Sequence, residues 1–138
     1  MINFKGDDMV ELNYKKVMQT LIDATKAIVT ECYVFEIASQ KIPINQKTPF
    51  VGIIMDIDSI EQVANRFECD FYFICGVNDA DEIKARNEAF DILNRIYQNI
   101  YFFNLPFIKK NDRPFSYLLQ HSNLTLMSLQ TKLAVIAL

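Results

Sequence analysis

The stretch from Phe67 to Tyr101 constrains the fold more than any other part of the sequence, because it reads as a strand that runs into a long helix. Within Glu68–Cys75, large apolar side chains alternate on both faces, with the two-residue period of a pleated strand. A strand that carries apolar groups on both faces is typical of the middle of a sheet. We therefore predict a central strand that ends at Gly76.

The residues after Gly76 predict a helix. Asp79 is the expected N-cap, and Glu82 three residues later gives the pattern of a capping box. Apolar side chains then recur at steps of four and three residues, at Ala85, Ala89, Ile92, Ile96 and Ile100, with Phe90, Leu93 and Tyr97 beside them. Such a stripe is expected to lie on a sheet. The pairs Lys84/Glu88 and Asp91/Arg95 fall on the opposite side and indicate a solvated face.

The rest of the chain supplies partners for this unit. Apolar residues from Val10 to Ile28 follow helical spacing, whereas residues 32–38, 50–57, 116–121 and 124–137 follow the spacing of strands. Residues 59–66 are expected to form a turn or one helical turn. The order α-β-β-β-α-β-β predicts a single α+β domain over residues 1–138, with two amphipathic helices packed on a mainly antiparallel sheet.

Composition and charge narrow the class of function. The chain is 51% hydrophobic, with 11 Phe and 6 Tyr, which is more apolar surface than a lone soluble monomer needs and favours association. A formal net charge of −3 argues against a general nucleic-acid or membrane-surface binder, because both require clustered basic side chains. The first residues lack the pattern of a signal peptide and no apolar run reaches about 18 residues, so we expect neither secretion nor a membrane span.

The usual catalytic and cofactor patterns are missing from the sequence. His121 is the sole histidine and has no second histidine for a relay, and the three glycines are isolated, unlike those of a phosphate-binding loop. Cys32, Cys69 and Cys75 lack zinc spacing, and the last two lie about 20 Å apart on one strand, too far for a disulfide. We expect buried thiols in a reducing compartment, no metal, no cofactor and no enzymatic activity.

Two other classes remain open. The order α-β-β-β-α-β resembles that of restriction-endonuclease-like nucleases, which hold Mg²⁺ with an acid near the second strand and a Glu-x-Lys on the third. Here Asp56 or Asp58 would be the first acid and Glu68 or Asp70 the second, but the lysine is missing. A solvated strand end is the simpler interpretation of these acids. The other class is a dimeric ligand-binding regulatory domain, which would show a pocket with convergent polar groups.

Two segments indicate contact with other molecules. The first half of residues 102–115 is too apolar for a solvent-exposed loop, and Pro106 and Pro114 exclude a helix or a central strand. Together with a C-terminal strand that offers unpaired backbone groups, they suggest a subunit interface at Phe102, Phe103, Leu105, Phe107, Ile108, Leu133 and Val135. The loop 39–49 is long and contains two prolines, and we expect it to make a contact through Lys41, Ile42, Pro43, Ile44 and Lys47.

The element order, carried above all by Phe67–Ile100, resembles that of the tail terminator, or tail-completion, proteins of long-tailed bacteriophages and related head-to-tail connector subunits. The likeness is one of size and element order over the whole chain. It implies a structural subunit of a homo-oligomeric ring, usually hexameric, in a virion assembled in the host cytoplasm. Its partners would be copies of itself and other connector or tail proteins, with DNA as passing cargo. Loop 39–49 would touch the ring stacked along the axis, and the mild acidity would suit a channel that repels DNA.

Overall fold

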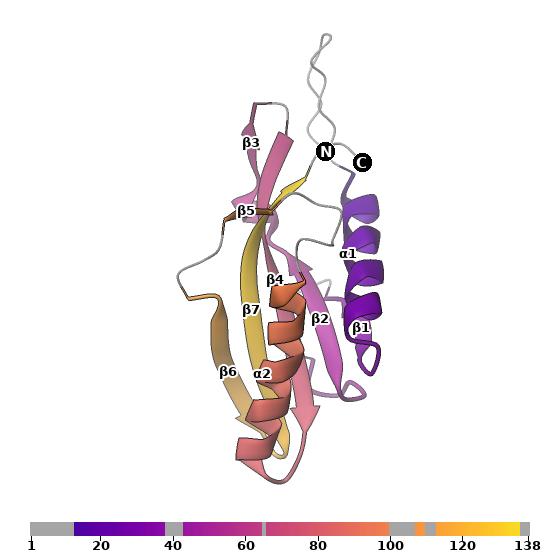
Figure 1. Ribbon diagram of the computed structural model, residues 1–138, viewed down its shortest axis with the longest axis vertical. Helices are drawn as coiled ribbons and strands as arrows, with labels where there is room; N and C mark the ends of the chain where they lie inside the picture. The colour runs from indigo at the N-terminus through magenta and orange to yellow at the C-terminus, as the bar shows by residue number, and fades with distance from the viewer. Residues whose placement is uncertain (1–12, 38–42, 65, 100–106, 110–112, 136–138) are drawn as a thin grey trace.

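The protein forms an α+β fold, as the sequence predicts, with two helices and a mainly antiparallel sheet (Figure 1). The computed structural model describes residues 13–37, 43–64, 66–99, 107–109 and 113–135. The elements in chain order are α1 (Tyr14–Ile28), β1 (Tyr33–Glu36), β2 (Phe50–Met55), the 3₁₀ turn η1 (Ile57–Ser59), β3 (Glu61–Val63), β4 (Arg66–Asn78), α2 (Glu82–Gln98), β5 (Phe107–Lys109), β6 (Phe115–His121) and β7 (Leu124–Val135).

The sheet is built around β4 and β7, which pair antiparallel over twelve rows from Phe67/Val135 to Asn78/Leu124. β2 lies on the other side of β4, and β1 adds to β2 as the sole parallel pair among the described strands. β5 and β6 both pair with the outer side of β7, and β3 pairs with β4 beyond the end of β2. The central strand predicted from the Phe67 stretch is thus confirmed as the middle of the sheet.

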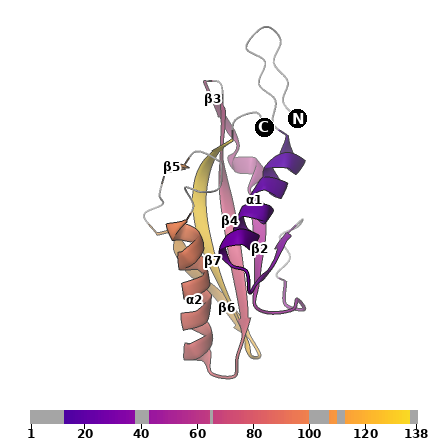
Figure 2. The same cartoon turned by 45° about the vertical axis from the view of Figure 1, so that its right-hand side comes forward.

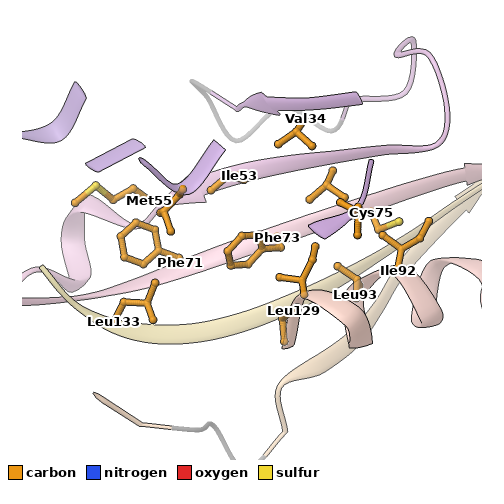
Figure 3. Close-up of a cluster of buried hydrophobic side chains, with 14 of the residues drawn as sticks. Val34, Ile53, Met55, Phe71, Phe73, Cys75, Ile92, Leu93, Leu129 and Leu133 are labelled. Carbon is orange, nitrogen blue, oxygen red and sulfur yellow. The ribbon is translucent and has the colours of Figure 1, made fainter. Parts of the chain in front are cut away.

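Both helices lie on the same side of the sheet, with α2 over β4 and β7 and α1 near β1 and β2 (Figures 1 and 2). Alternate β4 residues face them, so that Phe67, Phe71 and Phe73 are completely buried. Figure 3 shows Phe71 and Phe73 pointing into the same cluster as side chains of β2, β7 and α2. The helices contribute Val17, Met18, Leu21, Ala85, Ala89, Ile92, Leu93 and Ile96, which confirms most of the predicted helical stripes.

The junction between β4 and α2 differs from the prediction. β4 does not end at Gly76 but continues to Asn78, because β7 pairs with it to that residue. The N-cap of α2 is Asp81, whose side chain accepts hydrogen bonds from the backbone N–H groups of Ile83 and Lys84 at 3.1 and 3.2 Å. Asp79, the predicted cap, instead accepts from the Asp81 N–H at 2.8 Å. The strand is thus longer, and the helix starts later, than the local pattern suggests.

Residues 59–66 also differ from the expected turn. They contain the short strand β3, which folds back on the start of β4 through Ala64, a residue with a φ of 55°. All three residues of β3 are exposed, so no apolar alternation marked this strand in the sequence. Part of the predicted first helix, residues 10–12, and Ile100 of the second stripe lie outside the described residues.

Candidate functional site

The sheet face away from the helices has no helix over it among the described elements, and we call it the open face (Figure 2). Its middle carries the half-buried side chains of Ile54, Tyr72 and Ile74, next to Ser128 and Gln130. A hollow of about 760 Å³ lies elsewhere, at β1, whereas the hollow on this face measures about 560 Å³. The open-face hollow is lined by Tyr14, Ile37, Ile54, Met55, Asp56, Ile57, Asp58, Tyr72, Ile74, Ser116, Leu118, Ser128 and Gln130.

One end of the open face is apolar. Phe50, Leu124 and Leu126 form a second buried cluster there, separate from the core beneath the helices. The Phe50 ring lies 5.5 Å from that of Phe35 and covers the bare backbone of Gly76, where an added Cβ would meet its carbons at 2.2 Å. The glycine therefore makes room for a ring that closes this end of the sheet.

The opposite end of the open face is acidic. The Asp56 N–H donates to the Asp70 carbonyl at 2.9 Å, which places these two residues side by side, and Lys132 is the cross-strand partner of Asp70. Burial, followed by the negative charges of Asp56 and Asp70, raises the pKa of Tyr72. The structure thus brings together one acid from each pair that the nuclease interpretation requires.

The other acids of that interpretation are Glu68 and Asp58. Glu68 forms an ion pair with Arg66 at 3.0 Å, and Asp58 is exposed within η1, where its backbone N–H donates to the carboxylate of the N-cap Asp56 at 3.2 Å. Among the residues that the structure describes, no three His, Cys, Asp or Glu side chains are grouped so that they could hold a metal ion.

The predicted interface on the C-terminal strand needs correction. β7 offers no free edge along its described length to residue 133, because β4 pairs with one side and β5 and β6 with the other. Leu133 is completely buried in this chain's own core, so its side chain cannot contact a second subunit. The backbone of Val135 belongs to β7 and that of Phe107 and Ile108 to β5, whereas Phe102, Phe103 and Leu105 lie outside the described residues.

Among the described strands, β1 and the short β3 border the sheet on one side, and β5 and β6 border it on the other; β1 and β6 are the longest of these free borders (Figure 1). β6 contains no Asp, Glu, Lys or Arg over its seven residues, and Tyr117 and Leu118 are each 44% exposed. The Arg86 guanidinium lies 4.3 Å from the Tyr117 ring centroid, and a bulge separates Tyr117 from Leu119. Natural edge strands usually carry charges, prolines or bulges that oppose pairing with another chain; β6 has a bulge but no charged side chain of its own.

The edge strand β1 lies beside the larger hollow, which we call the β1 groove. It is lined by Lys26 and Thr30 at the end of α1, by Cys32, Tyr33, Val34 and Phe35, and by Gln46 and Lys47. The Lys47 ammonium lies 5.0 Å from the centroid of the Tyr33 ring, a cation–π distance. Of the predicted contact loop, Ile44 is exposed and Pro43 is half-buried, whereas Lys41 and Ile42 lie outside the described residues.

An ion-pair group fixes the start of β1 to α2. Arg95 donates from both terminal nitrogens to the Glu31 carboxylate, and its Nε lies 3.4 Å from Asp91. The hydrogen bond from Arg95 lowers the pKa of Glu31. The predicted Asp91/Arg95 pair is confirmed, but Lys84 pairs with Asp79 at 3.8 Å rather than with Glu88.

The thiols and the histidine do not form a reactive site in the described structure. Cys69 and Cys75 are completely buried, as predicted, and Cys32 is half-buried. Burial raises the pKa of Cys69 to about 11 and that of Cys32 to about 12, which keeps both protonated and poorly nucleophilic at neutral pH. His121 is exposed at the end of β6.

Comparison with known proteins adds no relative to this description. No protein-family model matches the sequence, and no curated protein does. Neither described helix is long and apolar enough to cross a membrane. The free edges and the open face were not foreseen from the sequence; the alternation of Asp70, Tyr72 and Ile74 was the available signal for a face that no helix covers.

Proposed function

We propose that this protein is a non-enzymatic structural subunit that assembles with copies of itself into a ring at the head-to-tail junction of a tailed bacteriophage. The observation that carries the proposal is the pair of free sheet edges, β1 and β6, on opposite sides of one subunit. Two different edges on opposite sides favour head-to-tail contacts, which close into a ring when the rotation between neighbours divides the circle. The resemblance to tail terminator and connector subunits supports a ring of six.

The distribution of layers suggests which way the sheet faces in such a ring. Both helices lie on one side of the sheet, and no described helix covers the other side (Figure 2). We place the helices on the outer circumference of the ring, so that the sheets face its axis. The open face would therefore line the channel.

The charges on the open face agree with a channel through which DNA passes. At its acidic end, Asp56, Asp58 and Asp70 outnumber the bases Lys132 and Lys109 of the neighbouring strands, while Glu68 is paired with Arg66. Carboxylates of this kind repel phosphate and so prevent tight binding of the duplex, whereas a surface rich in lysine and arginine would hold it.

Loop 43–49 would provide the contact along the ring axis. Ile44 is exposed there, and Lys47 is held against Tyr33 at the edge of the β1 groove. Deletion of residues 41–47 is expected to leave the circular dichroism spectrum unchanged but to abolish joining of heads and tails in an assembly assay. Asn45→Ala, an exposed single change in the same loop that does not line the β1 groove, is the control and should join normally. Normal joining by the deletion variant would refute the role of the loop.

Native mass spectrometry and light scattering test the proposal directly. The unmodified protein is expected at a mass near six times 16.0 kDa. Leu118→Lys places a charge on the β6 edge and is expected to lower that mass to one subunit, because a lysine on an edge strand opposes pairing with a strand of another copy. Asn87→Lys is the control, since Asn87 is exposed on α2 one turn beyond its acidic start, and its mass should equal that of the unmodified protein. A monomer at high protein concentration would overturn the proposal.

A further inference from the structure

The rows of the sheet connect its two free edges at the same height. Tyr33 of β1 pairs with Phe50, Phe50 with Gly76, Gly76 with Leu126, and Leu126 with Leu119 of β6. Tyr33 and Leu119 are thus the two ends of a single row. The same reasoning places Glu36 at the height of Phe115, through Ile53, Phe73 and Leu129.

The strand directions also fit. β1 runs parallel to β2, and three successive antiparallel pairs separate β2 from β6, so β6 runs opposite to β1. In a ring whose axis follows the strands, every subunit keeps the same direction along that axis. β6 of one copy would therefore meet β1 of the next as an antiparallel pair, which is slightly more stable per residue than a parallel one.

Some backbone N–H and C=O groups of β1 point away from the sheet, where a further strand could hydrogen-bond to them. The N–H groups of Tyr33 and Ile37 donate inward, to the carbonyls of Pro49 and Ile53 at 3.0 and 2.9 Å. Because backbone groups alternate in direction along a strand, those of Val34 and Glu36 point outward, toward the side on which no described strand pairs. That outer side is where the β1 groove lies, between α1 and loop 43–49.

The two edges carry complementary charge at the height where they would meet. The β1 groove has Lys26 and Lys47, while Glu31 beside it is already paired with Arg95. The far end of β6 lies against the acidic start of α2: with its amide nitrogen facing Glu82, Gln120 donates to that carboxylate at 2.7 and 2.9 Å.

Two more acids flank this end of β6. The Asp79 N–H donates at 2.9 Å to the carbonyl of Asn123 in the β6–β7 turn, and Asp81 caps the helix. Arg86 and Lys84 pair with Glu82 and Asp79, which leaves one acidic charge in excess at this end.

From these observations we infer that β6 of one copy docks in the β1 groove of the next, antiparallel and in the register that places Leu119 beside Tyr33, so that the sheets join around the ring. This inference rests on the proposed function. Self-association alone would not require β6 to meet the β1 groove, nor Leu119 to lie beside Tyr33.

A native thiol allows the alignment to be tested. Continuing the row by one residue places Cys32 of one copy beside Gln120 of its neighbour, both toward the helix side of the sheet. Gln120→Cys, treated with the thiol oxidant diamide at alkaline pH because burial keeps the Cys32 thiol protonated at neutral pH, is expected to form disulfides with Cys32 of the next copy. Because each subunit would be linked on both sides, non-reducing gels should show a ladder of multimers up to the size of the ring.

Three controls make the result specific. Cys32→Ser in the Gln120→Cys background should abolish the ladder. His121→Cys, the adjacent residue on the opposite face, should cross-link several-fold less. If Gln120→Cys folds poorly, the pair Leu119→Cys and Tyr33→Cys tests the same alignment and should give the same ladder. Asn87→Cys, exposed on α2 one turn beyond its acidic start, should give no multimers.

The outcomes separate the inference from the proposed function. Disulfide-linked dimers that persist after Cys32→Ser would show β6 pairing with β6 and overturn the inference. A native mass near six subunits without cross-linking by Gln120→Cys or by the pair Leu119→Cys and Tyr33→Cys would also overturn it, while leaving the ring in place. A monomer by native mass would overturn both.

Discussion

Replacement of Gly76 by alanine is expected to destabilise the protein, against the usual effect of this change. Gly76 lies within β4, where alanine normally stabilises by about 0.4–1 kcal/mol because it restricts the unfolded chain. Here the added Cβ would stand 2.2 Å from the Phe50 Cε2 and Cζ atoms, whereas carbon atoms pack best at about 3.5–4.0 Å. The ring would have to move by more than about 1 Å. Phe50 is completely buried, so it cannot move freely.

The expected magnitude follows from these two opposing effects. Overpacking of a well-packed core costs about 1–3 kcal/mol, and subtracting the backbone gain from the middle of this range leaves a net loss of about 1 kcal/mol in the free energy of unfolding. Gly52→Ala is the matched control in β2. Its Cβ would meet Ile37 Cδ1 at 2.4 Å, but this is the end of a flexible, half-buried side chain that can turn away. Its cost should therefore stay below about 1 kcal/mol.

Urea unfolding followed by circular dichroism measures these effects, at one fixed protein concentration because assembly would add to the apparent stability. Phe50→Leu removes the ring, so Gly76→Ala should cost little in that background. The double-mutant cycle should show a coupling of about 1 kcal/mol or more between the two positions. If Gly76→Ala were as stable as the unmodified protein, or if the two changes were additive, the steric argument would be refuted.

Three further predictions follow from the described contacts. Asp81→Ala should lower the free energy of unfolding by about 1 kcal/mol in urea titrations, because it leaves the Ile83 and Lys84 N–H groups without their cap, and Asp79→Ala should cost less. The folded-state pKa of Glu31 lies below its usual 4.5, so its contribution to stability is present above pH 4.5 and is lost as the pH falls through the folded-state pKa. In thermal unfolding between pH 3 and 7, Glu31→Gln should therefore lose less stability than the unmodified protein on the acid side. An equal loss of stability in the two proteins would contradict the prediction. DNA incubated with the protein and Mg²⁺ should remain uncut, and cleavage that disappears in Asp56→Asn would replace the structural proposal with the nuclease interpretation.

The sequence predicts the core of this fold well because burial leaves a periodic trace. The sequence predicts an apolar face on the strand around Phe71 and Phe73 and an apolar stripe on the helix from Ala85 to Ile96. In the structure these two surfaces pack in the same hydrophobic core. The end of β4 was misplaced because Gly76 looks like a terminator locally, whereas its role depends on Phe50, 26 positions earlier.

The candidate surfaces were harder to foresee, because they depend on which strands pair. The C-terminal strand looks like an edge in the sequence, but β5 and β6 cover its outer side, so Leu133 belongs to the core. The hydrophobic periodicity of a segment does not show which distant strand it pairs with. The exposure of Tyr117 and Leu118 at a sheet edge is therefore recognised only once β6 is known to be an edge strand. The ring interpretation itself remains a prediction.

The twelve-row ladder between β4 and β7 has a mechanical consequence. At about 3.4 Å per residue, it forms a two-stranded beam roughly 40 Å long. Its hydrogen bonds lie across the beam, so a pull along the strands would strain many of them at once instead of opening them one by one. A ring built from such strand pairs would resist a force along the strands far better than a force that separates the short strands β3 and β5 from the sheet.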